Sequence, residues 1–161
     1  KEEVESAYEQ FTRLVKVDGG DLEKTYRRLQ SSVDDTQDSV EEVDERIAAI
    51  ERVAEDLFDE WRDELAQYSN PSLRRSSEQQ LRDTQARYQQ MLASMKRARS
   101  RIDPVLHVFQ DHVLFLKHNL NARALASLKN EVSRIEGKVD VLIRDMEAAI
   151  AEAGRFIATM Q

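Results

Sequence analysis

The sequence contains no cysteine, and its 161 residues include only four glycines and two prolines. The lack of cysteine excludes a disulfide framework, a thiolate metal site and a cysteine nucleophile. Aromatic residues make up 6% of the chain, and with so few turn-forming residues this is too little for a sheet protein of this size. Ala, Glu, Asp, Arg, Gln and Leu are abundant instead, and this composition predicts long helices.

Long apolar runs are also missing from the sequence. No stretch approaches the roughly 18 apolar residues that a helix needs to cross a bilayer, so we expect the chain as given not to span a membrane. The net charge is −7, from 31 acidic and 24 basic residues. This acidic surplus argues against a nucleic-acid partner and against adhesion to an anionic membrane surface, because both require an excess of Lys and Arg.

A continuous heptad pattern occupies residues 21–68. Apolar side chains recur there in alternating steps of four and three, which is typical of a long helix with one buried stripe. The segment Gly19-Gly20-Asp21 precedes the pattern and Ser69-Asn70-Pro71-Ser72 follows it, and both are helix-boundary signals. The positions of this ladder are Leu22, Tyr26, Leu29, Val33, Thr36, Val40, Val43, Ile47, Ile50, Ala54, Leu57, Trp61 and Tyr68.

Two further ladders predict helices at residues 72–118 and 122–160. The first stays in phase across Asp103-Pro104, which leaves open a kinked continuous helix or a break at Pro104, and the preserved phase favours the kink. The phase then slips within residues 117–121. Asn119 suits a helix end and Asn121 suits the start of the next helix, so we expect a tight turn there.

Residues 1–17 form a shorter amphipathic pattern, and we expect the protein to continue upstream of Lys1 and complete a fourth helix. Together the patterns predict an all-α fold in which residues 1–161 form a single domain. We expect an elongated antiparallel bundle of three long, coiled-coil-like helices with a shorter N-terminal helix.

The charge distribution supports the first hairpin of this bundle. Residues 21–68 carry a net charge of −10 and residues 69–103 a net charge of +5. A turn near residue 70 places the basic cluster opposite the acidic one, so we interpret the cluster as an intramolecular counter-face rather than a nucleic-acid patch. This register places four cations of the second long helix opposite one region of the first. The cations are Lys96, Arg97, Arg99 and Arg101, and the region contains Glu45, Asp44, Glu42 and Val40.

The histidines are the only residues whose spacing resembles a metal site. His107, Asp111 and His118 lie with Asp103 on one stripe of the predicted second long helix. A di-metal bundle requires Glu-x-x-His pairs on separate helices, and the sequence has none, so we interpret the stripe as a solvated face and expect no metal. We expect His112 to be a buried or half-buried neutral imidazole on the core seam.

No catalytic or cofactor-binding motif is present, neither a Walker loop nor a Gly-x-Gly-x-x-Gly, Gly-x-Ser-x-Gly or His-Glu-x-x-His segment. We therefore expect no enzyme activity and no cofactor. Trp61 and Tyr68 lie near the first predicted hairpin end, where they fill the core or form an exposed tip that docks a partner. Asn119 and Asn121 form the other candidate interaction site, although turn chemistry accounts for both.

Several segments resemble an uncharacterised bacterial family, domain of unknown function number two-nine-five-nine. The most distinctive of them runs Leu116-Lys117-His118-Asn119-Leu120-Asn121-Ala122-Arg123-Ala124. The resemblance implies an exported protein of Gram-negative bacteria, often with a lipoprotein-type leader and a further helical stretch. It brings no established activity or catalytic residue. The other resembling segments are residues 17–23, 57–61, 67–70, 72–75, 77–82 and 103–106.

These observations predict a non-enzymatic structural or protein-interaction module, and the family resemblance implies a periplasmic or envelope-anchored location. We expect a protein partner or self-association through a residual apolar stripe, no nucleic acid, and a membrane tether through an N-terminal segment. Two alternatives stay open. One is a small-ligand- or metal-binding bundle that uses His107, Asp111 and His118, and the other is a membrane-surface-associated rod.

Overall fold

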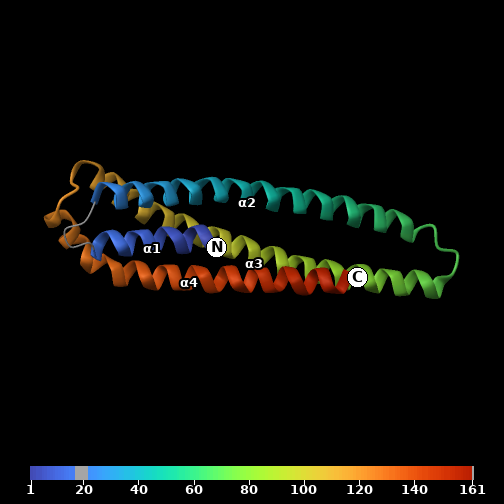
Figure 1. Cartoon of the computed structure of the whole chain (residues 1–161). Coiled ribbons are helices and arrows are strands. Elements are labelled where there is room, and N and C mark those ends of the chain that lie inside the picture. The colour runs from blue at the N-terminus through green and yellow to red at the C-terminus, as the bar shows by residue number, and fades with distance from the viewer. Residues whose placement is uncertain (17–21, 161) are drawn as a thin grey trace.

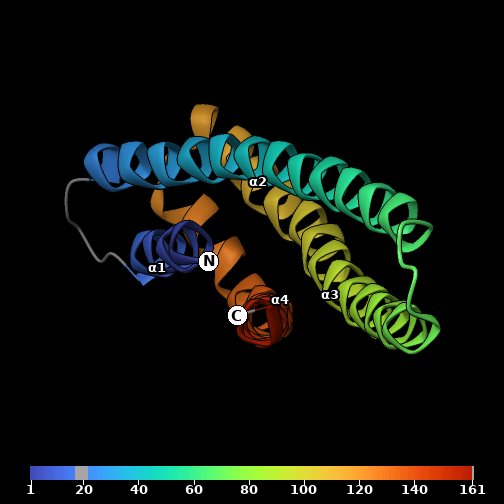
Figure 2. The ribbon, with the colours of Figure 1, turned by 90° about the vertical axis from the view of Figure 1, so that its right-hand side faces the viewer.

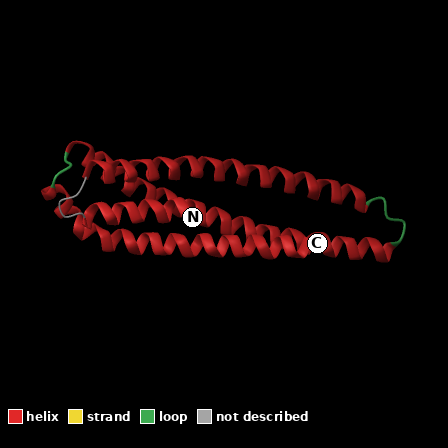
Figure 3. Ribbon diagram, in the orientation of Figure 1, coloured by secondary structure: helices red, strands yellow, loops and turns green. Residues whose placement is uncertain are grey.

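The computed structural model describes residues 1–16 and 22–160, which form four helices and no strand. The helices are α1 (Glu2–Lys16), α2 (Leu22–Leu65), α3 (Pro71–His118) and α4 (Ala122–Met160). Figures 1 and 3 show them packed lengthwise into an elongated bundle, so the all-α fold predicted from the sequence is confirmed. The expected start signal Gly19-Gly20-Asp21 lies outside the described residues.

The four helices form a ring in which each helix contacts its two neighbours. Helix α1 packs against α2 and α4, and α3 packs against the same two helices from the other side (Figure 2). Because α1 is much shorter than the others, it lies beside only part of the rod, near the α3–α4 turn (Figure 1). The bundle therefore has a four-helix half, and a three-helix half that extends from the level of Lys1 toward the α2–α3 turn.

The helix ends follow local hydrogen bonding. The Asn70 Oδ1 atom accepts bonds from the backbone N–H groups of Ser72 (2.9 Å) and Leu73 (3.3 Å), so Asn70 caps α3. Helix α3 continues without interruption through Pro104 to His118, and Pro104 does not break it. Helix α2 ends at Leu65, three residues before the end of the predicted helix at 68.

The predicted turn between α3 and α4 is also present. The Asn119 backbone N–H donates to the Leu116 carbonyl over 3.2 Å. The Asn121 Oδ1 atom accepts a bond of 3.0 Å from the Ala124 N–H at the start of α4. The two asparagines thus close one helix and open the next, as their turn chemistry indicates.

The apolar core consists of two clusters, one in each half of the bundle. In the four-helix half a large apolar cluster includes Phe11, Leu29, Phe109 and Leu142, each 0–1% exposed. In the three-helix half a smaller cluster surrounds Tyr88. Its buried members, which keep 5–9% of their surface exposed, are Ile47, Ala54, Phe58, Leu65, Leu81, Tyr88, Met91 and Leu92.

The α2–α3 ion pairs join the acidic and basic segments in a register shifted from the predicted one. Arg99 binds Asp44 rather than Glu42, through bonds of 2.6 and 2.7 Å. Lys96 pairs with Glu51, six residues from the predicted Glu45. Gln110 bonds Gln37 over 2.6 Å with a similar offset, so the two helices themselves are shifted from the predicted register.

Arg101 departs further from the expected pattern. It pairs with Asp145 of α4 and not with α2. The prediction of a single counter-face for all four cations was wrong for this residue, because successive positions on α3 point to different neighbours. Ile47 and Ala98 lie beside the same hollow, as the predicted hairpin requires.

Candidate functional site

The predicted histidine stripe is an exposed face of α3. His107, Asp111 and His118 are all exposed. Asp103 is half-buried and accepts a 2.7 Å bond from the Arg99 Nη1 atom. Across residues 1–16 and 22–160, no three His, Asp or Glu side chains are grouped so as to hold a metal ion. The stripe therefore offers no ligand set.

His112 lies instead on the inner side of α3, against α1. Its ring packs on Phe11 with 4.9 Å between the ring centroids. Burial lowers the pKa of His112 below its usual value, because desolvation disfavours the charged imidazolium. The imidazole is neutral at neutral pH and belongs to the packing between the helices.

The four residues predicted as an interaction surface do not lie together. Trp61 is half-buried and its Nε1 atom donates a 2.8 Å bond to the Ser77 Oγ atom, so it joins α2 to α3. Tyr68 is exposed beside the α2–α3 turn. Asn119 and Asn121 lie at the opposite end of the rod (Figure 1).

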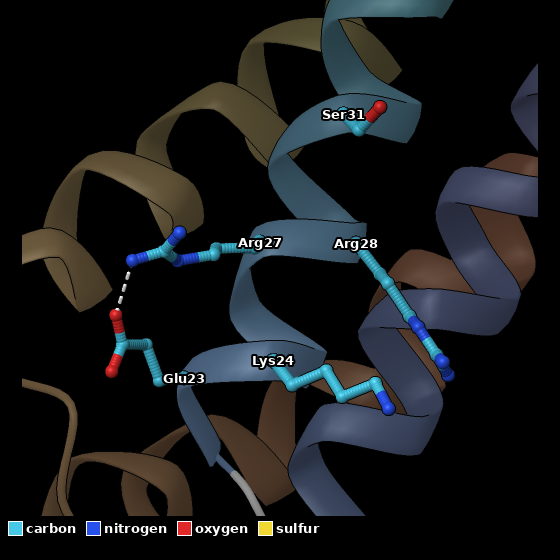
Figure 4. A pocket seen from close by; sticks show the side chains of 5 residues that line it. All are labelled: Glu23, Lys24, Arg27, Arg28 and Ser31. Atoms are coloured by element: carbon cyan, nitrogen blue, oxygen red, sulfur yellow. Dashed lines mark hydrogen bonds and ion pairs between the residues drawn. The ribbon is translucent and has the colours of Figure 1, made fainter.

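A small hollow on the outer face of α2 carries basic side chains. Figure 4 shows Arg27 turned toward Glu23, with 2.5 Å between the Arg27 Nη2 and Glu23 Oε1 atoms. The side chains of Lys24 and Arg28 extend toward α1. All of its lining residues, Ser31 included, come from one helix and are exposed. Exposed cations on a single helix are a solvated surface and not a formed binding site.

A different hollow is apolar and lies between α2 and α4, and we call it the α2–α4 groove. Helix α3 forms its floor, and it begins beside Lys1 at the start of α1. Its volume is about 300 Å³. The residues around it are Val43, Arg46, Ile47 and Ile50 of α2, Met95, Ala98, Arg99 and Ile102 of α3, and Met146, Ala149 and Ile150 of α4.

Further apolar side chains are exposed on α2 and α4 closer to the α2–α3 turn. On α2, Val53 is 67% exposed and Leu57 is 39% exposed. On α4, Ile150 is 63% and Ile157 is 57% exposed. Branched side chains of this size normally lie inside a protein. The exposed Val43, Ile50 and Ile150 that line the groove therefore make it a candidate binding surface.

The sequence predicts a residual apolar stripe but does not indicate which ladder residues stay exposed. Val43, Ile50 and Leu57 belong to the same heptad ladder as the buried Leu29 and Val33. No property of these side chains separates covered from uncovered positions. Which positions are covered depends only on where α1 lies along the rod. The amphipathic pattern does not predict that position.

The architecture defines a class: an all-α rod that, within its described residues, has an apolar groove and no cluster of metal-ligating groups. The chain belongs to the family described as "Protein of unknown function (DUF2959)", whose model matches residues 1–160. The resemblance inferred from the sequence is therefore confirmed. No curated protein and no solved structure matches the chain.

The described helices are too polar to cross a bilayer. Within residues 1–16 and 22–160, none combines the required length with the required apolar character.

Proposed function

We propose that the protein is a non-enzymatic structural and protein-interaction module of the bacterial cell envelope. The observation that carries this proposal is the α2–α4 groove, which is lined by the exposed apolar residues Val43 and Ile50 of α2 and Ile150 of α4. A contiguous apolar surface on a chain that is otherwise rich in charge is typical of an interaction site. In this proposal the rod binds another protein and does not transform a small molecule.

The envelope location is supported by the family resemblance, which implies export in Gram-negative bacteria. The shape of the bundle suits a spacer. Helix α3 has 48 residues, which at 1.5 Å per residue span about 70 Å. A module of this length, tethered through an N-terminal segment, would hold its two ends far apart.

Crosslinking and capture of the complete protein in its host tests the interaction role. We expect one defined protein partner at constant stoichiometry, and we expect the protein to fractionate with the periplasm or the envelope membranes. Recovery of the protein alone after crosslinking would contradict the interaction role. Recovery from the cytoplasm would contradict the envelope location.

The two alternatives predict different results for the purified protein. A metal-binding bundle would melt at a higher temperature with added Zn²⁺ or Fe²⁺, and His107→Ala and His118→Ala would remove the increase. A membrane-surface rod would float with neutral or anionic liposomes. We expect neither result, and either one would replace the proposal.

A further inference from the structure

We propose that a hollow between α3 and α4 binds an acidic peptide segment of a partner protein, at the place where Pro104 and Gly137 lie on opposite walls. We call it the α3–α4 hollow, and it is separate from the α2–α4 groove. The inference rests on the proposed interaction function and adds a second site with its ligand chemistry. The exposed residues on its walls are Ser100, Arg101 and Pro104 of α3, and Arg134, Gly137 and Lys138 of α4.

The hollow contains the residue types that a helix interior tolerates least, which are proline and glycine. Pro104 lies inside the 48-residue helix α3, and Gly137 lies inside the 39-residue helix α4. A Cβ atom added at Gly137 would meet no atom within 4 Å, so the packing of the bundle does not require a glycine there. Local rules of helix stability are broken mainly at functional sites, and here both helices break them beside one hollow.

Gly137 leaves the backbone of α4 uncovered on its wall of the hollow. Glycine is the residue that lets a second main chain approach a backbone closely, because it has no Cβ atom. The hollow has a volume of about 380 Å³, which lies within the usual range of ligand pockets. The open space above Gly137 therefore admits the main chain of a peptide.

Pro104 leaves a backbone acceptor on the opposite wall. Proline has no N–H group, so the Ser100 carbonyl lacks the donor that an α-helix normally supplies four residues further on. The Ser100 hydroxyl donates to the Arg97 carbonyl over 2.8 Å and does not replace that donor. Since Ser100 and Pro104 both line the hollow, a peptide N–H that enters it can bond this carbonyl.

The charged side chains of the hollow favour a peptide that carries carboxylates. Lys138 has no ion pair within residues 1–16 and 22–160. Arg101 contacts Asp145 with its Nε atom, and Arg134 binds Glu131 with its Nη1 atom. A guanidinium has five N–H donors, so both arginines keep donors for a further anion. Three cations against two carboxylates leave a local positive excess in a chain whose net charge is −7.

A synthetic peptide provides the test. The probe is a short fluorescent peptide in which Glu alternates with Ala, and its control has Gln in place of every Glu. We expect the Glu peptide to bind the 161-residue chain in an anisotropy titration, and to bind more weakly as the salt concentration rises. The Gln peptide should not bind. Glutarate has two carboxylates but no peptide N–H, and at the same concentration it should not displace the Glu peptide.

Two glycine substitutions separate binding from stability. Gly137→Leu fills the hollow, and Gly154→Leu is its control, because Gly154 is also an exposed glycine of α4 with no atom within 4 Å of an added Cβ. Leucine is the better helix former, so both variants should melt roughly 2–4 °C higher by circular dichroism. We expect only Gly137→Leu to weaken peptide binding, by at least about tenfold. Loss of a structural contact would not raise the melting temperature.

Two further changes test the remaining parts of the hollow. Lys138→Gln should weaken binding about fivefold and reduce its salt dependence. Lys129→Gln makes the same change at an exposed lysine of α4 outside the hollow and should leave binding unchanged. Pro104→Ala supplies the Ser100 carbonyl with a donor inside α3, so this variant should melt at a higher temperature and bind the peptide more weakly.

Several results would overturn the hollow as a peptide site. These are no binding of the Glu peptide, equal binding of the Gln peptide, binding that Gly137→Leu leaves intact, and equal weakening by Lys129→Gln. Displacement by glutarate would show a site for small anions instead. Capture of a host partner without peptide binding would contradict the hollow and support the interaction function. Absence of both the host partner and peptide binding would contradict both.

Discussion

The two halves of the rod share the same helices but bury their side chains to different depths. Every large side chain that is less than 2% exposed belongs to the four-helix half, including Phe11, Leu29 and Phe109. In the three-helix half even the best-buried residues, Leu81 and Met91, keep 5% of their surface exposed. The comparison shows that an amphipathic stripe determines which face of a helix is available, while the number of neighbouring helices determines how completely it is covered.

The largest effect should come from the centre of the four-helix half. Phe11→Ala removes a fully buried ring that packs against Phe109 with 6.0 Å between centroids. We expect the free energy of unfolding to fall by about 3–5 kcal/mol. Phe156→Ala, in the half-buried cluster of the three-helix half, should cost about 1–2 kcal/mol. Urea denaturation followed by circular dichroism measures both, and equal losses would contradict the comparison.

A smaller effect is expected at the boundary between the halves. Arg99 joins α3 to α2 by two bonds to Asp44 and makes a third bond to Asp103. Both carboxylates are half exposed, so water compensates part of the loss. We expect Arg99→Ala to lower the free energy of unfolding by about 1–2 kcal/mol. Arg46→Ala, which removes a pair within α2, should cost about 0.3–0.5 kcal/mol, and a similar cost for both would contradict the role of Arg99.

The helix caps at the two ends of the rod allow a direct comparison. Asn70→Ala leaves the Ser72 and Leu73 N–H groups without their partner, and Asn121→Ala does the same for Ala124. We expect each substitution to cost about 1 kcal/mol in thermal or urea unfolding. Because both caps are exposed, the costs should be alike. A much larger cost at one end would show that its turn contributes more than capping.

A pH dependence of stability is expected to originate in the four-helix half. His112 has a lowered pKa in the folded state, so the unfolded chain takes up the proton first as the pH falls below about 6.5. The stability due to the neutral ring is present above that pH and is lost below it, by at most about 1.4 kcal/mol per pH unit. His112→Leu should remove this decline between pH 6.5 and 5. An unchanged decline would assign it to other groups.

Asp44 acts in a separate, more acidic window. The Arg99 guanidinium holds the pKa of Asp44 below its usual value near 3.8. Its contribution is therefore present above that pH and is lost as the pH falls through the lower folded value. The two windows distinguish loss of packing around His112 from loss of the α2–α3 ion pair.

Most of the fold could be predicted because its signals are local. The heptad ladder predicted α2, Asn70 and Pro71 marked the start of α3, and the phase slip before Asn121 marked the last turn. Each signal depends on residues within one or two helical turns. The exact pairing of charges between helices was less accessible, because Arg101 reaches Asp145 of α4 and not the acidic cluster of α2.

The candidate site could not be predicted from the sequence, because it depends on how the helices pack and not on local signals. Ile50 and Leu29 occupy equivalent ladder positions, yet Leu29 is fully buried and Ile50 is 36% exposed. Their difference depends on whether α1 lies alongside, which is a property of the whole assembly. The residues that the sequence did mark, Trp61 and Asn121, already have partners in Ser77 and Ala124. Tyr68 remains exposed, and its role in docking stays a prediction.

The single tryptophan of the chain gives the rod a built-in optical reporter. Trp61 donates its indole N–H to Ser77 close to the α2–α3 turn, far from the Phe11 cluster. Its fluorescence emission therefore reports separation of α2 from α3 at that end of the rod. Circular dichroism, in contrast, averages over all the helices. If the end frays before the rest melts, the two signals will follow different temperature curves without any added label.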